Sequence, residues 1–134
     1  MGILNFIQRN KIELSDEQKK EEKMWALWEE ELAESPYAEL MTYQSEINNG
    51  GHSQYFFNIE SSGDLQKEMM ILESVLSEKL KSNLRKAYKA YLVLDENEMD
   101  EKAETMLEQC DDLFYENEEE INNKLKEYAM KMKL

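Results

Sequence analysis

The chain has 134 residues, enough for one domain, and its 30 acidic against 16 basic residues give a formal net charge of −14. This excess of acid argues against direct binding to nucleic acid or to an anionic membrane surface, because both need surplus lysine and arginine. Only four glycines and one proline are present, too few for the turns of a β-sandwich or barrel. We therefore expect a single all-α domain of six or seven helices over residues 15–134, preceded by an N-terminal arm at residues 1–14.

The arm carries a small apolar cluster at residues 3–7, and the sequence leaves open whether it docks, frays or builds a dimer. The first helix begins at Ser15, which forms a capping box with Gln18. Trp25 and Trp28 follow at helical spacing, so we expect both in the core.

The next helix is expected to start with Ser35 as its N-cap and Pro36 as its first residue. Residues 48–51, Asn-Asn-Gly-Gly, should end that helix, because asparagine and glycine tolerate the left-handed conformation of helix caps. A short aromatic helix should follow and end near Asn58, before a loop at residues 61–63.

Four further helices are expected in the rest of the chain. Asp64 and Ser77 are the candidate N-caps of two helices with regularly spaced leucines. Another helix is expected from about Glu98 to Phe114, and a last one from about Glu118 to Met132. No internal repeat or long linker divides the chain.

Acidic residues are concentrated in one stretch, residues 95–120, which holds 13 acids and a single base, Lys102. A step of about 100° per residue gathers six of these acids on one side of the predicted helix, opposite an apolar side. The six are Glu98, Glu101, Glu104, Glu108, Asp111 and Asp112. The apolar side comprises Met99, Ala103, Met106, Leu107, Cys110 and Leu113.

Successive carboxylates of this set are on the order of 4.5–6 Å apart along the helix axis, which is comparable to the spacing of phosphates along a nucleic-acid strand. An ordinary solvated helix face mixes Glu with Lys, because like charges four residues apart repel. The pattern thus favours an anionic surface for a basic partner, with a merely solubilising acidic face as the alternative. Five further acids would extend the surface: Asp95, Glu116, Glu118, Glu119 and Glu120.

No catalytic or metal-binding motif is recognisable, so we expect a protein that is not an enzyme and has no cofactor or metal. The single histidine, His52, is more typical of a loop or helix start than of a ligand. The single cysteine, Cys110, lies on the apolar side of its helix and is expected to be a buried structural thiol. One unpaired cysteine and no leader or membrane span indicate a cytoplasmic location.

Residues 46–58 read Glu-Ile-Asn-Asn-Gly-Gly-His-Ser-Gln-Tyr-Phe-Phe-Asn. This pattern, E-x-x-N-G-G-x-x-Q-Y-F-x-N, resembles the signature of the DMP-type DNA-mimic proteins, a bacterial family. The later Leu-Phe-Tyr at residues 113–115, followed by acids and an amphipathic helix, also fits. The resemblance covers roughly residues 25–130. It implies an all-helical, homodimeric, cytoplasmic regulator that occupies the DNA-binding face of a helix-turn-helix transcription factor.

The signature itself is interpreted as structural. We expect Asn49, Gly50 and Gly51 to cap a helix and turn the chain, and Tyr55, Phe56 and Phe57 to return to the core. Gln54 and Asn58 are expected to satisfy backbone groups at nearby helix ends. His52 departs from the apolar residue more common in the family, which could loosen the packing there.

Three functions remain open at this stage. The acidic surface favours a regulator that binds a basic DNA-binding protein in place of nucleic acid. An immunity or antitoxin-like protein that neutralises a basic toxin would have the same sequence features. A ligand binder or enzyme would instead use a pocket lined by Asn48, Gln54, Tyr55 and Asn58.

Overall fold

The computed structural model describes residues 15–29 and 33–131, and every regular element in these two ranges is an α-helix. The helices are α2 (Asp16–Glu29), α3 (Tyr37–Ser62), α4 (Leu65–Glu73), α5 (Glu78–Glu96), α6 (Glu101–Glu116) and α7 (Glu118–Lys131). The predicted all-α class is therefore confirmed for the described part of the chain. The predicted arm at residues 1–14 lies outside it.

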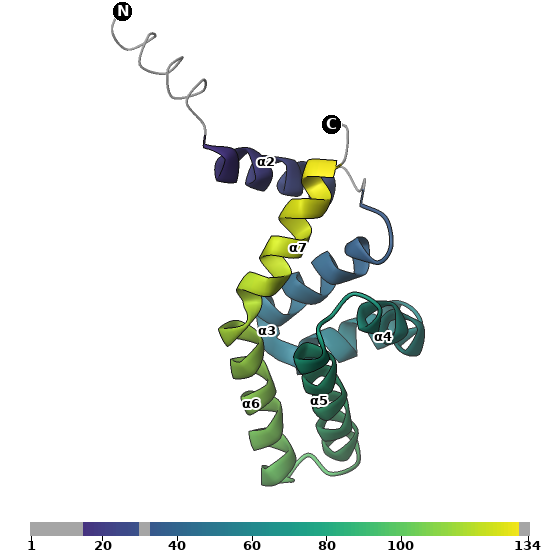
Figure 1. Cartoon of the computed structure of the whole chain (residues 1–134). Helices are drawn as coiled ribbons and strands as arrows, with labels where there is room; N and C mark the ends of the chain where they lie inside the picture. Colours follow the sequence, from purple (N-terminus) through teal and green to yellow (C-terminus); the bar gives the residue numbers. More distant parts are fainter. Residues whose placement is uncertain (1–14, 30–32, 132–134) are drawn as a thin grey trace, which may run out of the picture.

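Helix α3 lies at the centre of the molecule, where it contacts α4, α5, α6 and α7 (Figure 1). Helices α5 and α6 pack side by side, and α7 follows α6 and packs against α2. Fully buried aromatic rings fill the junction of α3 and α6: the Tyr43 ring centroid lies 5.1 Å from that of Tyr55 and 5.4 Å from that of Phe114. Edge-to-face ring pairs of this kind add to the stabilisation from burial alone.

Several helix starts are those that the sequence predicts. The Ser15 amide donates to Gln18 Oε1 and the Gln18 amide donates to Ser15 Oγ, which completes the capping box. The Asp64 carboxylate accepts from the Lys67 amide, and the Ser77 hydroxyl accepts from the Leu80 amide. Side-chain acceptors thus satisfy amides that a helix start leaves unpaired.

Two helix starts differ from the prediction. Helix α6 begins at Glu101, capped by Asp100, so Glu98 lies in the preceding turn rather than in the helix. Asp100 is the N-cap because its carboxylate accepts a hydrogen bond from the Ala103 backbone amide. Ser35 is not an N-cap: its hydroxyl donates to the Glu39 carboxylate instead.

The predicted helix end at residues 48–51 is confirmed, because α3 consists of two helical halves that meet at a non-helical residue, Gly51. The aromatic second half ends at Ser62, so the expected end near Asn58 and the expected loop at residues 61 and 62 are wrong. At the kink, Gly51 has φ 80° and ψ −176°, a conformation almost restricted to glycine. A Cβ at Gly51 would also collide with the Asp111 carboxylate of α6. The predicted sharp turn at the glycines is therefore confirmed.

Some predicted core residues are exposed. Trp25 is 58% exposed on α2, and Phe57 is 64% exposed on the outer side of α3. Met99 is 84% exposed because it falls in the turn before α6. Met106 is 39% exposed, whereas Ala103, Leu107, Cys110 and Phe114 form the buried side of α6. The side chain of Trp28 lies outside the described residues.

The kink predicts that Gly51→Ala destabilises the protein by about 3 kcal/mol or more, because both backbone strain and a steric clash oppose the methyl group. Urea unfolding followed by circular dichroism measures the change. The control is Gly63→Ala, since Gly63 has an extended φ of −170° and a Cβ there would meet only the Ile59 carbonyl oxygen at 3.9 Å. Equal stability of the two variants would contradict the role assigned to Gly51.

Candidate functional site

The acidic side of α6 faces away from the core. Glu101, Glu104, Glu108 and Asp112 are exposed, and Glu98 is exposed in the turn before the helix. The buried side of α6 lies opposite, as the helical period predicts. These five carboxylates therefore meet solvent, as does Glu116 at the end of α6, and Lys102 is the one base between Glu98 and Glu116.

Four of the six predicted acids line one hollow of about 380 Å³: Glu98, Glu104, Glu108 and Asp111. Leu94, Leu107 and Ser53 complete its lining, so the hollow joins α6 to the end of α5 and the second half of α3. No basic side chain is among these lining residues. The hollow is thus suited to a cationic group, whereas Glu101 and Asp112 lie outside it.

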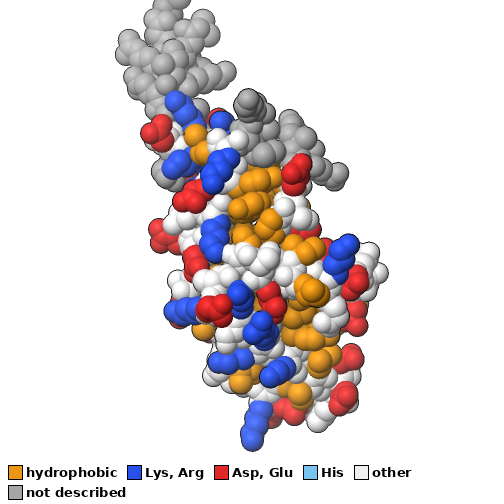
Figure 2. Space-filling model, turned by 45° about the vertical axis from the view of Figure 1, so that its right-hand side comes forward, with side chains coloured by type: hydrophobic (Ala, Val, Ile, Leu, Met, Phe, Trp, Pro, Cys, Tyr) orange, Lys and Arg blue, Asp and Glu red, His pale blue; other side chains and the backbone are white. Residues whose placement is uncertain are grey.

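Lysines border the acidic side of α6. Lys86, Lys89 and Lys102 line a groove of about 340 Å³ between α5 and α6, together with apolar residues that include Val93 and Met106. Figure 2 shows a face of the molecule on which cationic, anionic and hydrophobic side chains are interspersed. The exposed acids of α6 therefore form a strip that these lysines border on the side of α5.

Asp111 differs from the other five acids, because its carboxylate is bonded inside the protein. Its Oδ1 accepts from the His52 backbone amide at 2.9 Å and from the His52 ring Nδ1 at 2.6 Å. This amide directly follows the kink at Gly51, where a helix start needs an acceptor from elsewhere. Asp111 therefore acts as a cap for the second half of α3, although its side chain stays 26% exposed at the hollow.

His52 is fully buried and bonded through both ring nitrogens. Its Nε2 lies 2.7 Å from the Tyr43 hydroxyl oxygen. Burial, with smaller contributions from Tyr55, Cys110 and Asp111, raises the pKa of Tyr43 well above its usual value, so the phenol keeps its proton. Tyr43 then donates to Nε2, while Nδ1–H donates to Asp111. The expected loosening at His52 is wrong, since the ring ties the two halves of α3 to α6.

The side-chain amides of Gln54 and Asn58 bind a carboxylate, and not the backbone groups that were predicted as their partners. Gln54 Nε2 and Asn58 Nδ2 both donate to Glu46 Oε2, at 3.0 and 2.8 Å. They do not satisfy backbone groups at helix ends, because the kink brings the Glu46 carboxylate of the first half of α3 within their reach. Glu46, the first residue of the signature, thus accepts from Gln54 and Asn58 of the same signature. These two hydrogen bonds join the two halves of α3 across the kink.

Tyr55 and Phe56 are fully buried, as predicted. The Tyr55 hydroxyl and one oxygen each of Glu39 and Glu68 are buried without a hydrogen-bond partner among the described residues. Burial, and then repulsion from Glu39, raise the pKa of Glu68. Buried polar atoms without a hydrogen-bond partner lower the stability of the fold, so these three side chains are unfavourable to folding.

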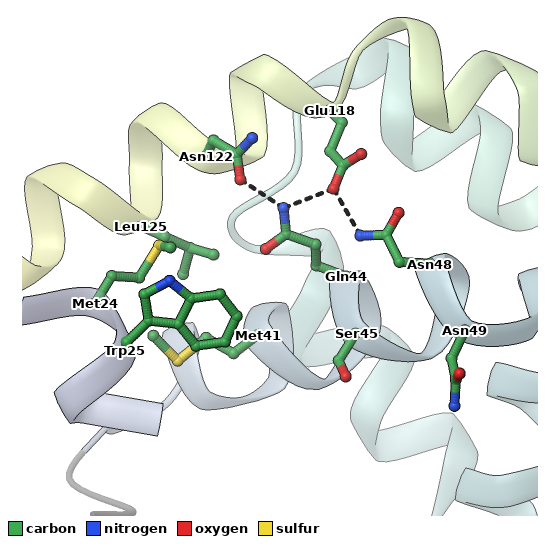
Figure 3. Close-up of a pocket in the computed structure, with 10 residues that line it drawn as sticks. All are labelled: Met24, Trp25, Met41, Gln44, Ser45, Asn48, Asn49, Glu118, Asn122 and Leu125. Carbon is green, nitrogen blue, oxygen red and sulfur yellow. Dashed lines mark hydrogen bonds between the residues drawn. The ribbon is translucent and has the colours of Figure 1, made fainter. Parts of the chain in front are cut away.

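The largest cavity described, about 630 Å³, lies where α2, α3 and α7 meet (Figure 3). We call it the α2–α3–α7 cleft. Its lining residues are Met24, Trp25, Met41, Gln44, Ser45, Asn48, Asn49, Glu118, Asn122 and Leu125.

Polar side chains join α3 to α7 along this cleft. Gln44 Nε2 donates to Glu118 Oε2 at 2.9 Å and to Asn122 Oδ1 at 2.6 Å. Asn48 Nδ2 donates to the same Glu118 oxygen at 2.7 Å. Of the four residues predicted to line a ligand pocket, only Asn48 does so; Gln54, Tyr55 and Asn58 lie elsewhere in α3.

Sequence reasoning missed Gln44 and Asn122, although the spacing of four between Gln44 and Asn48 puts both on one side of α3. Glu118, predicted as an extension of the acidic surface, is instead turned into the cleft by the two amides.

Other predicted chemistry can be placed as well. Cys110 lies on the buried side of α6, in the hydrophobic core of the protein. Burial raises the pKa of its thiol, as expected of a structural cysteine. Among the described residues, no three His, Cys, Asp or Glu side chains are grouped so as to hold a metal ion. Within the same ranges, none of the helices combines the length and apolar character needed to cross a membrane.

We predict that Asp111→Asn lowers the free energy of unfolding by about 2–4 kcal/mol, because a neutral amide replaces the charged acceptor of two hydrogen bonds to His52. The neighbouring Asp112→Asn, which removes an exposed carboxylate, should change it by less than about 0.5 kcal/mol. Denaturant titration compares the two. A comparable effect at both positions would contradict the structural role of Asp111.

Glu68→Gln should raise stability by about 0.5 kcal/mol at pH 7, because it removes a repelled, partly buried carboxylate beside Glu39. A raised folded-state pKa means that the protonated form favours folding, and that this advantage is lost as pH rises through the folded pKa. The gain should therefore shrink as pH falls toward 4.5, the ordinary pKa of the group. Unfolding curves at several pH values, with exposed Glu127→Gln as control, test this; a loss of stability at pH 7 would overturn it.

Comparison with known proteins finds one family that matches the chain. The model of the DMP19-like protein family matches residues 33–132, which include the kinked helix, its signature and the acidic helix. No curated protein and no solved structure matches the chain significantly. The match extends over most of the chain, which therefore belongs to the DMP19-like protein family.

Proposed function

We propose that this protein is a non-enzymatic, cytoplasmic regulator that binds a basic DNA-binding protein, such as a helix-turn-helix transcription factor, in place of nucleic acid. The contact is made by the exposed acids of α6 and its preceding turn. The proposal includes a homodimer, which would place two such strips on one particle. Family membership supports it by the resemblance described above.

One observation carries the proposal: five carboxylates face solvent along α6, whose opposite side is buried. Exposed like charges at steps of three and four residues repel one another and lower helix stability, so their presence needs another reason than the fold. A lysine- or arginine-rich surface relieves that repulsion on binding. The hollow between Glu98, Glu104 and Glu108 would receive one such side chain.

Asp111 takes a secondary part in this scheme. Its Oδ1 accepts two internal hydrogen bonds, so its contribution to a partner is its charge at the rim of the hollow. A binding test should leave it intact, because its removal would weaken the fold as well as the surface.

The test is affinity capture from a lysate of the source cells at low salt, with elution by a salt gradient and identification by mass spectrometry. The five-acid variant carries Glu98→Gln, Glu101→Gln, Glu104→Gln, Glu108→Gln and Asp112→Asn. The control variant removes five exposed acids elsewhere: Asp16→Asn, Glu22→Gln, Glu29→Gln, Glu34→Gln and Glu127→Gln. Both variants have the same net charge.

We expect the native protein and the control variant to retain the same DNA-binding protein, and the five-acid variant to bind it at least about tenfold more weakly. Binding should fall with added salt, because exposed charge pairs are screened. Capture of a basic toxin would support the immunity-like alternative instead. Equal retention by the five-acid variant would refute the electrostatic mechanism.

A further inference from the structure

The α2–α3–α7 cleft has the size and the mixed lining of a ligand site. Its volume of about 630 Å³ lies within the range of small-molecule pockets. Met24, Met41 and Leu125 give it apolar walls, and the Trp25 indole is 58% exposed beside them. Glu118 is the one charged residue among those that line it.

The hydrogen bonds fix which polar atoms the cleft offers. An ionised carboxylate only accepts, so Gln44 and Asn48 must both turn their NH₂ groups to Glu118. The Gln44 carbonyl oxygen lies on the side of Trp25 and Leu125 in Figure 3, whereas the Asn48 oxygen lies on the side of its amide that is away from Trp25. The cleft therefore presents acceptors and a negative charge.

This set of groups selects one chemistry. An anion would meet Glu118 with no basic lining residue to balance it. A cation with several N–H donors would donate to the Gln44 oxygen and to the Glu118 carboxylate, and its positive charge would be attracted to the indole face. The methionine and leucine walls suit an alkyl stem behind that cation.

We propose that the cleft binds a guanidinium group on an alkyl chain, either in a free small molecule or as an arginine side chain of another protein. Glu118 and the Gln44 carbonyl hold the guanidinium, and Trp25 covers it. None of the five acids assigned to the α6 surface lines this cleft, so the inference stands or falls independently of the proposed function.

The full-length protein is titrated with three probes, followed by tryptophan fluorescence and by calorimetry. Agmatine represents a free small molecule, N-acetylarginine amide represents a protein side chain, and N-acetylcitrulline amide is the neutral isostere of the second. We expect at least one guanidinium probe to bind at least tenfold more tightly than the citrulline probe. Tighter binding of agmatine would indicate the first source, and tighter binding of the arginine amide the second.

Substitutions of two cleft residues, Glu118 and Trp25, locate the site, and each has a control variant. Glu118→Gln should weaken guanidinium binding at least tenfold, whereas its exposed neighbour Glu119→Gln should change it less than twofold. Trp25→Ala should weaken binding and abolish the fluorescence response, while Trp25→Phe should retain most of the affinity. Trp25 is largely exposed, so these two variants test the site even if Glu118→Gln unfolds. Equal binding of the arginine and citrulline probes, no binding of either guanidinium probe, or unchanged affinity in Trp25→Ala would overturn the proposal.

Discussion

The break in α3 at Gly51, held by the Asp111 carboxylate, is the constraint on which the arrangement of the other helices depends. It divides α3 into two helical halves, and the His52 amide at the start of the second half donates to the Asp111 carboxylate of α6. The same carboxylate fixes the His52 ring, which in turn reaches the Tyr43 hydroxyl. The contact is made in the same rotation of α6 that buries Ala103, Leu107, Cys110 and Phe114, and it thus adds to the apolar packing that leaves the other acids outside.

The acids of α6 have two roles, since Asp111 bonds inside the protein whereas the others face solvent, and the position of each acid around the helix decides between them. Asp111 is the predicted acid nearest to the buried side of the helix, about 40° from Leu107 in the helical projection. Its carboxylate therefore reaches the kink, while the other acids point to water. Lysines along the neighbouring groove limit the anionic surface to a strip. A strip of charge gives a partner a defined register, which a uniformly acidic coat would not.

The helical fold was predictable because periodic leucines and capping residues act locally, and Ser15, Asp64 and Ser77 cap the helices that they were expected to cap. Periodicity also gave the buried and exposed sides of α6. It could not give the partners of Asp111, Glu46 or Glu118, because those hydrogen bonds join residues that only the kink and the packing of α7 bring together. For the same reason Trp25 was misplaced: helical spacing marks a side of α2, but not whether another helix covers its whole length.

The central claim is that the acids of α6 take the place of DNA on a DNA-binding protein. The most direct measurement is displacement: the captured partner is bound to a fluorescent duplex of its own operator, and the native protein is added while anisotropy is followed. The account predicts that the duplex is released, and that the five-acid variant does not release it at the same concentration. A ternary complex in which the duplex stays bound, or equal release by the five-acid variant, would contradict it.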